Sequence, residues 1–345
     1  MVPMPFLKEA AMKALFIGGT GTISSAISRL APELGWEIYH LNRGSRKSEF
    51  TNAAQIPCDI RAEGTAEIRE KIEKAIGSGE RFDVVADFIG FVPDHIQKDI
   101  DIFNGLCKQF IFISSASAYQ KPLSSYLITE STPLSNPYWR YSRDKIACEE
   151  LLTAKYRENG FPITIVSPSH TYDERSVPLG VHGSKGSWQV LKRMTCGKPV
   201  IIHGDGTSLW TLTHSSDFAF AFTRLMGNIH AIGEAVHITS DESVTWNQIY
   251  QIIADTLNVK LKAVHIASEY LVKRSEDKYE FRGGLLGDKA HSVVFDNTKL
   301  KRLVPEFCAK IRTDEGIPLT IANILANKDL QIDDPEFDQW CDRIS

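Results

Sequence analysis

The sequence predicts an α/β fold, a doubly wound parallel sheet with a smaller α/β portion after it. Short runs rich in β-branched and aromatic residues recur in the first half, and longer stretches with helical spacing of apolar residues separate them. Runs that are apolar on both faces and alternate with helices are typical of a parallel sheet covered on its two sides. The expected strands are 14–17, 37–41, 83–87, 109–113 and 163–166, and the expected helices include 23–34, 67–76 and 143–158.

After about residue 170 the pattern changes, which indicates a second region. The expected strands are sparser there, at 199–203, 235–238 and 263–266, and turns such as Gly204-Asp205-Gly206 interrupt them. The length of 345 residues allows about two domains. We therefore expect one domain over 12–170 and a second lobe mainly over 171–330 that interleaves with the first. The acidic segment 331–345 is expected to be a solvated tail that docks Trp340.

Composition and charge exclude several classes of protein. The chain carries 39 Lys+Arg against 43 Asp+Glu, a formal net charge of -4, whereas a general nucleic-acid or anionic-membrane binder normally has a basic excess. Its six cysteines include no Cys-x-x-Cys pair, its ten histidines include no helix-spaced metal pair, and no segment approaches the ~20 apolar residues of a membrane span. Residues 1–8 lack the apolar stretch of a signal peptide. We expect a cytoplasmic protein with free thiols and without bound metal, membrane or nucleic acid.

A glycine-rich turn follows the first expected strand and opens the first expected helix. It reads Gly18-Gly-Thr-Gly-Thr-Ile-Ser24. Glycines let the backbone turn tightly and approach a pyrophosphate, and the following helix N-terminus supplies free N–H groups and a positive dipole end. Such a turn also occurs between ordinary strands and helices, but its place at the start of a βαβ pattern predicts a dinucleotide site. The residues expected to contact the dinucleotide are Gly18, Thr20, Gly21, Thr22 and Ile23.

The ends of the second and third strands bear on which dinucleotide binds. NAD sites usually place Asp or Glu at the end of the second strand to hold the ribose hydroxyls, whereas NADP sites avoid that charge and often offer Arg to the 2′-phosphate. Asn42 and Arg43 occupy that place, which favours NADP; the alternative is that Arg43 is solvated or stacks on the adenine ring. Asp59, followed by Ile60, is expected to accept a hydrogen bond from the adenine amino group or, alternatively, to cap the next helix.

A serine, a tyrosine and a lysine form the candidate catalytic set. The fifth expected strand runs into Ser115, and a helix about 25 residues later contains Tyr141 and Lys145. Their i, i+4 spacing places the tyrosine and lysine side chains on one helix face, about 5–6 Å apart. A lysine ammonium beside a phenol lowers the phenol pKa, so the tyrosine could act as general base on a hydroxyl or as general acid on a carbonyl, while the serine polarises the same oxygen. The alternative is an ordinary pair on the helix surface.

Together these motifs resemble the extended short-chain dehydrogenase/reductase superfamily, and more narrowly the NAD-dependent epimerase/dehydratase family. The resemblance rests on the glycine turn, Ser114-Ser-Ala-Ser-Ala-Tyr119, Tyr141-Ser-Arg-Asp-Lys145 and Gly204-Asp-Gly206, and it covers about residues 12–320. It implies a Rossmann-type domain with a C-terminal α/β substrate lobe, an NAD(P) cofactor and a small-molecule substrate. It also implies a homodimer packed through the helix that holds Tyr141.

The resemblance further implies roles for single residues. Tyr141 would be the acid/base, Lys145 would bind the nicotinamide ribose, and Ser115 would hydrogen-bond the reacting oxygen. The tyrosine and the lysine are thus expected to contact the cofactor as well. Ser117 corresponds to a secondary substrate contact, and Pro168 to the proline near the nicotinamide.

The sequence departs from the family pattern where nucleotide-sugar enzymes hold the diphosphate. Those enzymes usually place an arginine where Ser208-Leu-Trp210-Thr stands and another before a Gly-Asp pair, where this chain has Leu285-Leu-Gly-Asp288-Lys289. Arginine's fork suits bidentate phosphate recognition, which Leu or Trp cannot replace. A smaller sugar or polyol-like substrate is therefore a further possibility.

Other side chains are candidates for the same region. A cation from Lys289, Arg282 or Lys185 could compensate for the missing arginines; the alternative is that each is a solvated surface charge. Trp188 and Trp210 are candidates for lining the substrate pocket, and the alternative for both is the protein core.

We expect an NAD(P)-dependent epimerase or oxidoreductase that acts on a secondary hydroxyl or ketone of a sugar or nucleotide-sugar-like substrate. Dehydratases of the family usually carry an Asp-Glu pair beside the catalytic Ser/Thr; Ala116-Ser117 stands there, which counts against dehydration. The glycine turn, with Asn-Arg-Gly after the second strand, also resembles a branch that contains plastid RNA-binding proteins. The alternative is therefore a non-catalytic dinucleotide-fold protein that binds RNA or a protein partner.

Overall fold

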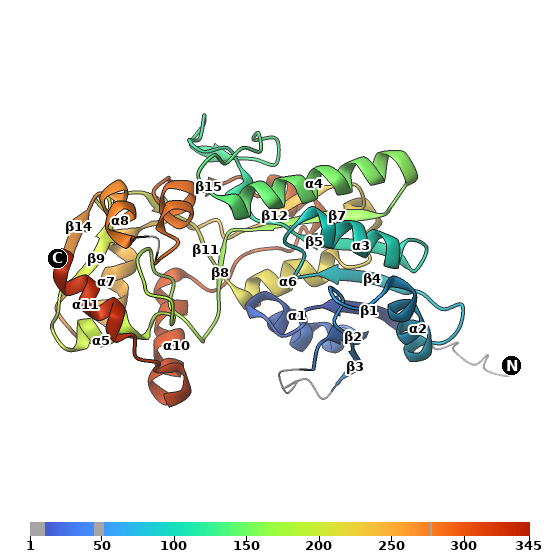
Figure 1. Ribbon diagram of the computed structural model, residues 1–345, viewed down its shortest axis with the longest axis horizontal. Helices are drawn as coiled ribbons and strands as arrows, with labels where there is room; N and C mark the ends of the chain where they lie inside the picture. Colours follow the sequence, from blue (N-terminus) through green and yellow to red (C-terminus); the bar gives the residue numbers. More distant parts are fainter. Residues whose placement is uncertain (1–10, 45–51, 277) are drawn as a thin grey trace, which may run out of the picture.

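The central feature of the computed structural model is a seven-stranded sheet in the order β12-β7-β5-β4-β1-β2-β3 (Figure 1). The structure describes residues 11–44, 52–276 and 278–345. Every neighbouring pair of strands in this sheet is parallel, which confirms the predicted α/β fold class. The strands are β1 (Met12–Ile17), β2 (Trp36–Asn42), β3 (Ala53–Pro57), β4 (Phe82–Asp87), β5 (Cys107–Ile113), β7 (Ile163–Pro168) and β12 (Ala235–Ile238).

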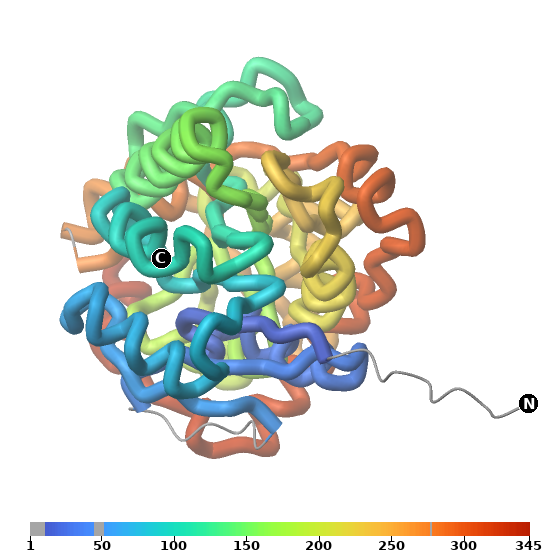
Figure 2. Tube along the Cα trace, turned by 90° about the vertical axis from the view of Figure 1, so that its right-hand side faces the viewer, coloured from blue at the N-terminus to red at the C-terminus, as the bar shows by residue number. Residues whose placement is uncertain are grey.

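Different helices cover the two faces of the sheet, because alternate residues of each strand point to opposite sides. The covering helices are α1 (Thr22–Glu33), α2 (Thr65–Ile76), α3 (Pro93–Phe103), α4 (Arg140–Asn159) and α6 (Ser215–Leu225). In β1, Ala14 and Phe16 join the core that includes α1 and α6, whereas Leu15 and Ile17 join the core that includes α2, α3 and α4. Figure 2 shows α4 (green) and α6 (yellow) well apart, in line with this division. Because all seven strands are parallel, their carboxyl ends lie at the same edge of the sheet, between the helices that cover its two faces.

A second lobe lies at the left of Figure 1 and consists of short strand pairs and helices. The strand pairs outside the main sheet are β10–β13, β11–β8, β14–β9 and β15–β6. Their strands are β6 (Leu127–Ile128), β8 (His170–Tyr172), β9 (Val200–His203), β10 (Leu209–Trp210), β11 (Leu212–His214), β13 (Val244–Thr245), β14 (Ala263–Ile266) and β15 (Val294–Phe295). The remaining α-helices are α5 (Trp188–Thr195), α7 (Trp246–Thr256), α8 (Ser268–Ser275), α9 (Thr298–Leu303), α10 (Thr313–Ala326) and α11 (Pro335–Ile344).

The chain returns to the main sheet after it has entered the second lobe. Both α6 and β12 lie beyond residue 170, yet α6 packs on the sheet and β12 pairs with β7 at its edge. The predicted boundary near residue 170 stays a prediction.

The C-terminal segment docks Trp340, as expected, but it forms a helix, α11, that packs against the second lobe and is not a solvated tail. Phe337, Trp340 and Cys341 are buried in its core cluster, and the indole of Trp340 lies near the ring of Phe281. The Trp340 Nε1 donates a hydrogen bond to the backbone oxygen of Arg274 at 2.8 Å. The side chains of Asp333, Glu336 and Asp342 are exposed, that of Asp338 is half-buried and that of Asp334 is buried, while the apolar side chains recur at helical spacing and face the core.

Two further findings concern the part of the chain that the structure describes. None of its helices is long and apolar enough to cross a membrane. It also contains no group of three or more His, Cys, Asp or Glu side chains arranged to hold a metal ion. Residues 1–8, for which the sequence predicts no signal peptide, lie outside the described residues.

Candidate active site

The glycine turn between β1 and α1 has no room for a side chain at Gly18. Gly18 has φ +81°, and a Cβ added there would lie 2.5 Å from the Cγ2 of Ile89. The hydroxyl of Ser24 accepts a hydrogen bond from the Gly21 N–H at 2.8 Å and donates one to the Gly18 oxygen at 2.9 Å. The serine at the third fingerprint position therefore holds the turn in place. α1 begins at Thr22 with no acidic residue in its first turn, so its free N–H groups suit an anion such as a pyrophosphate.

A cavity of about 610 Å³ opens beside this turn, here called the glycine-turn groove. It runs along the carboxyl ends of β1, β2 and β4, where ligands of doubly wound folds bind. Asp59 lines this groove, and its Oδ1 also accepts from the N–H groups of Arg61 and Ala62, at 3.1 and 3.2 Å. These bonds close the turn at residues 59–62 and do not cap the next helix, α2, whose N-cap is Gly64. The structure brings together here the predicted cofactor residues Gly18, Thr20, Gly21, Thr22, Ile23, Asn42, Arg43, Asp59 and Ile60.

Substitution of Gly18 by alanine is expected to weaken both folding and dinucleotide binding. The new Cβ meets a backbone with positive φ and the side chain of Ile89. Gly35 is the matched control, because its φ is +86° but a Cβ there would meet no atom within 4 Å. We expect Gly35→Ala to cost about 1–2 kcal/mol of unfolding free energy from backbone strain alone. Gly18→Ala should cost more and raise the dinucleotide Kd by about tenfold or more; equal costs with unchanged binding would contradict this.

A buried ion-pair network that the sequence did not reveal fixes the loop after β3. The Arg61 guanidinium donates to Asp99 at 2.7 Å and to Asp87 at 3.2 Å, and neither aspartate side chain is exposed. Asp87 ends β4, Asp99 lies on α3, and Arg61 also lines the glycine-turn groove. Burial raises the pKa of Asp99 well above its ordinary value, and the field of Asp87 adds to the rise. No local motif marks this network, because its members are 26 and 38 residues apart.

A second cavity, of about 260 Å³, is lined by two of the three candidate catalytic residues, Ser115 and Tyr141, and is called here the Tyr141 cavity. Ser115 follows the end of β5, and Tyr141 lies in the first turn of α4, so the two hydroxyls approach from different elements. Of the remaining predicted residues, Ser117, Pro168 and Trp210 also line the cavity. The structure therefore places one predicted serine, the tyrosine and three predicted neighbours around one space.

The hydroxyl of Ser115 belongs to a chain of hydrogen-bonded serine hydroxyl groups. Its Oγ lies 2.8 Å from the Oγ of Ser117 and accepts from the Ser117 N–H at 3.2 Å. The Oγ of Ser117 in turn lies 2.7 Å from the Oγ of Ser142, the residue after Tyr141. Ser142 is fully buried and was not among the predicted site residues. Because hydroxyls both donate and accept, this chain can adjust its donors when the oxygen facing Ser115 changes charge.

Lys145 is buried and is held by backbone oxygens. Its Nζ donates to the Gly90 oxygen and to the Ile113 oxygen, each at 2.6 Å, and lies 5.8 Å from the centre of the Tyr141 ring. Burial lowers the pKa of Lys145 to about 8. Two of its three donors are thus committed to the ends of β4 and β5, beside the glycine-turn groove.

The expected lowering of the Tyr141 pKa by Lys145 is not found. Burial raises the pKa of Tyr141, the hydrogen bond with Ser115 lowers it in part, and the field of Asp288 raises it further. The phenol therefore carries its proton at neutral pH. A protonated phenol beside a second hydroxyl is suited to give a proton to a carbonyl oxygen.

Glu149 lies one helical turn after Lys145 and gives a testable pH dependence. It is buried, bonds to the Ser114 hydroxyl, and burial raises its pKa to about 7 from the ordinary 4.5. The folded state thus holds this proton more tightly, so its contribution to stability is present below about pH 4.5 and is lost as the pH rises to 7. We expect Glu149→Gln to remove this decline, measured by urea unfolding at several pH values, and the exposed Glu150→Gln to keep it. An unchanged decline in Glu149→Gln would refute the assignment.

Three sequence expectations about the substrate region need correction. The prediction that Trp188 lines the substrate pocket is not met, because its Nε1 donates to Asp333 at 3.0 Å, away from the Tyr141 cavity. Lys289 is not a solvated surface charge, because it lines that cavity next to Asp288. Arg282 is exposed, and Lys185 donates to the backbone oxygen of Asp333. Lys289, one of the candidate cations, and Asp288 both lie in a π-helical segment, Arg282–Lys289, that no simple periodicity marks.

The sheet order, the glycine turn and the neighbouring Ser–Tyr–Lys set are those of a nicotinamide-dependent enzyme. The model of the NAD dependent epimerase/dehydratase family matches residues 14–239, and the chain belongs to this family. A 2'-dehydrokanamycin reductase of Streptomyces kanamyceticus is 24% identical over 303 residues, which are 87% of this chain and 81% of the relative.

Solved structures show the same fold. An epimerase of Methanothermobacter thermautotrophicus has a TM-score of 0.74 at 17% identity, over 93% of this chain and 94% of that one. A UDP-glucose 4-epimerase of Thermotoga maritima has a TM-score of 0.71 at 21% identity, over 91% and 99% of the two chains.

Proposed function

We propose that the protein is an NAD(P)-dependent reductase of a ketone on a sugar-type substrate, able to oxidise the matching secondary alcohol in reverse. One observation carries this proposal: the Tyr141 and Ser115 hydroxyls line one cavity, and the tyrosine has a raised pKa. A bound nicotinamide dinucleotide would supply or accept the hydride. In reduction, Ser115 donates a hydrogen bond to the carbonyl oxygen, and Tyr141 gives that oxygen its phenolic proton. In the reverse direction Tyr141 takes the hydroxyl proton back.

The residues around the Tyr141 cavity support a substrate without a diphosphate. None of the described residues that line it is an arginine, and its one lysine, Lys289, adjoins the carboxylate of Asp288. A diphosphate would need bidentate cations at this place. The name of the Streptomyces relative also supports a substrate without a diphosphate, since that protein is called a 2'-dehydrokanamycin reductase. We therefore propose a sugar ketone of the glycoside kind, with epimerisation of a nucleotide sugar as the second candidate.

Two measurements test this function. The nucleotide retained by the purified protein is identified by mass spectrometry, and loss of reduced nicotinamide is then followed with 2'-dehydrokanamycin and with a UDP-bound 4-keto sugar. We expect net hydride transfer to the kanamycin derivative. Tightly held NAD with interconversion of UDP-sugars and no net redox change would favour the epimerase. A protein that transfers no hydride and binds RNA or a partner would be the non-catalytic alternative.

We also propose that the cofactor is NADP. The end of β2 offers no carboxylate to a ribose hydroxyl, because the residue there is Asn42. Its amide accepts from the Gly44 N–H at 2.9 Å and donates to the Gln55 side chain at 3.0 Å. Arg43 lines the glycine-turn groove and is exposed. A 2′-phosphate placed there would gain a charge-assisted hydrogen bond from this guanidinium.

Substitution of Arg43 by alanine is expected to raise the KM for NADPH by about tenfold or more, because a hydrogen bond to a charged group is lost. The KM for NADH should stay within about twofold, since NADH has no 2′-phosphate. Arg157→Ala, an exposed arginine in the last turn of α4, is the matched control. Equal changes for both cofactors would place Arg43 outside the phosphate site.

We further propose a homodimer that packs through α4. The apolar side chains of Ile146, Ala147 and Ala154 on this helix are partly exposed. Burial of such residues in a second copy would remove them from water. Light scattering of the purified protein should give twice the mass of one chain, and a single-chain mass would exclude the dimer.

A further inference from the structure

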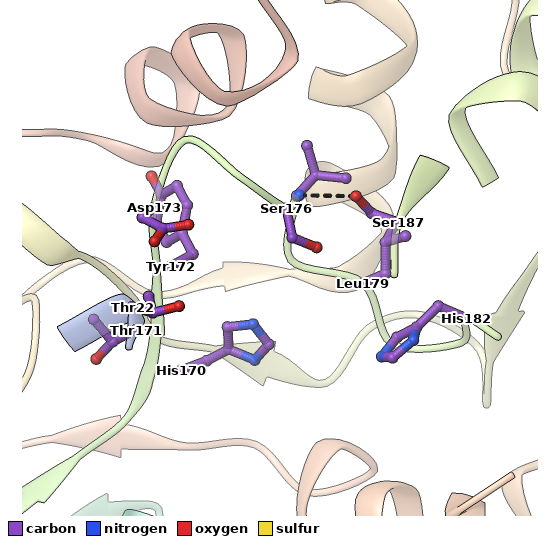
Figure 3. A pocket seen from close by; sticks show the side chains of 10 residues that line it. Thr22, His170, Thr171, Tyr172, Asp173, Ser176, Leu179, His182 and Ser187 are labelled. Carbon is purple, nitrogen blue, oxygen red and sulfur yellow. Dashed lines mark hydrogen bonds between the residues drawn. The ribbon is translucent and has the colours of Figure 1, made fainter. Parts of the chain in front are cut away.

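A third cavity of about 130 Å³ lies between the other two. It shares His170 with the Tyr141 cavity and Thr22 with the glycine-turn groove. We call it the histidine cavity, after the rings of His170 and His182, which face it together with Asp173, Ser176 and Ser187 (Figure 3). A whole ligand usually needs about 300–1,000 Å³. The histidine cavity is therefore large enough for one part of a ligand that extends from the Tyr141 cavity.

The two imidazoles are neutral and face the cavity with free nitrogen atoms. The Nδ1 of His182 lies 2.8 Å from the oxygen of Gly183; a carbonyl only accepts, so Nδ1 donates and Nε2 is left as an acceptor. The ring of His170 has no hydrogen-bond partner among the described residues. Burial lowers the pKa of the His170 ring to about 3, whereas the His182 side chain is exposed. The Nε2 of His182 is thus an acceptor, and the His170 ring is an acceptor and a donor, for hydroxyl or amino groups of a ligand.

The charges around the histidine cavity do not suit a phosphate. None of the described residues that line it is a lysine or an arginine, and its one carboxylate, Asp173, is paired with Arg175 at 2.7 Å. Arg175 is thus engaged, and its second nitrogen donates to the Thr22 hydroxyl at 3.1 Å. The positive field of Lys289 reaches both imidazoles and lowers their pKa. A neutral hydroxyl group meets no unpaired charge among the described residues that line the cavity.

The walls of the cavity fit a hydroxylated ring. Val177 and Leu179 are buried and offer apolar surface, while the hydroxyls of Ser176 and Ser187 and the two imidazoles offer polar atoms. The Ser187 Oγ already accepts from the Val177 N–H at 3.2 Å, so its own proton is free to be donated elsewhere (Figure 3). Apolar surface with a few placed polar groups is the composition of a small-molecule subsite.

We propose that the histidine cavity is a subsite for a second hydroxylated or amino-bearing ring, joined to the ring that reacts at Tyr141. The substrate is then a glycoside of at least two rings. This inference rests on the proposed reduction of a sugar-type ketone. It adds the recognition of a ring that takes no part in the chemistry, with His182 as a specificity residue.

The test compares ligands with one and with several rings. Dissociation constants for kanamycin A, methyl α-D-glucopyranoside and UDP-glucose are measured by calorimetry in the presence of NADP⁺. We expect His182→Ala to raise the Kd of kanamycin A by about three- to tenfold, because one hydrogen bond is lost. The Kd of the one-ring glycoside should change by less than about twofold. His182→Gln, whose amide keeps an acceptor, should recover most of the affinity. The exposed His230→Ala is the matched control.

Three results would overturn the subsite proposal. They are an unchanged Kd of kanamycin A in His182→Ala, an equal rise of the Kd for both glycosides in that variant, and a lower Kd for UDP-glucose than for kanamycin A. Thermal unfolding of each variant separates a binding effect from a folding defect. Failure of the reductase proposal itself gives a different result, the absence of hydride transfer in the wild-type protein. A reductase whose multi-ring ligands bind independently of His182 would keep the function and lose only the subsite.

Discussion

Replacement of Tyr141 by phenylalanine is expected to lower kcat by about 10²–10⁴, the usual contribution of general acid catalysis. The phenol proton is the acid in the proposed reduction, and Ser115 donates a hydrogen bond but is a much weaker source of protons. The dinucleotide Kd should change by less than about tenfold, the limit for one neutral hydrogen bond. Steady-state kinetics and a fluorescence titration with NADPH measure the two quantities separately.

The matched control for this variant is Tyr126→Phe, which removes the same hydroxyl from a strongly exposed side chain. Its kcat should equal that of the wild-type protein. Turnover of Tyr141→Phe within about tenfold of wild type would exclude Tyr141 as the acid. A parallel loss of turnover and unfolding temperature would instead indicate a structural role.

Replacement of Arg61 by methionine is expected to lower the unfolding free energy by about 3–5 kcal/mol at pH 7, the cost of leaving a buried charge unpaired. The change leaves Asp87 and Asp99 without their shared cation, and neither side chain can reach water. Protonation of Asp99 relieves the repulsion, because burial and the field of Asp87 already raise its pKa and the loss of the Arg61 charge raises it further. The deficit should therefore shrink as the pH falls from 7 towards 5. Urea unfolding at the two pH values measures it.

A second substitution distinguishes charge from packing. Asp99→Asn added to Arg61→Met removes one of the two buried charges, so it should restore part of the lost stability at pH 7. A deficit below about 1 kcal/mol in the single variant, or one that is equal at both pH values, would show that the ion pairs contribute little.

Local patterns predicted the parts of the site whose residues are close in the chain. The glycine turn is recognisable because Gly18, Gly21 and Ser24 act within one strand-to-helix connection. The pair Tyr141 and Lys145 is recognisable because one helical turn separates them. The strands were predicted because burial on both faces leaves an unbroken apolar run in the sequence.

The parts that depend on the packing of distant segments were missed. Arg61 meets Asp87 and Asp99 only through the packing of β4 and α3, and Asp288 lines the Tyr141 cavity from the π-helical segment. The pKa of Tyr141 was predicted in the wrong direction because spacing shows that Lys145 is near, but not that two carbonyl oxygens hold its ammonium.

The last helix is a different case, because the sequence contains its signal. Phe337, Trp340, Cys341 and Ile344 recur at helical spacing, and three of them are buried. The acidic residues between them gave the segment the composition of a solvated tail. They are instead the outer face of an amphipathic helix, in which Asp338 and Asp342 bind Arg193 and Lys198.

The return of α6 and β12 to the main sheet has a consequence for the independence of the two lobes. The chain crosses between them more than once, so several backbone segments connect them. A gene fragment that stops near residue 170 would leave the edge of β7 unpaired and one face of the sheet without α6. The region after residue 170 is therefore not an exchangeable module, because part of it completes the main sheet and its cover.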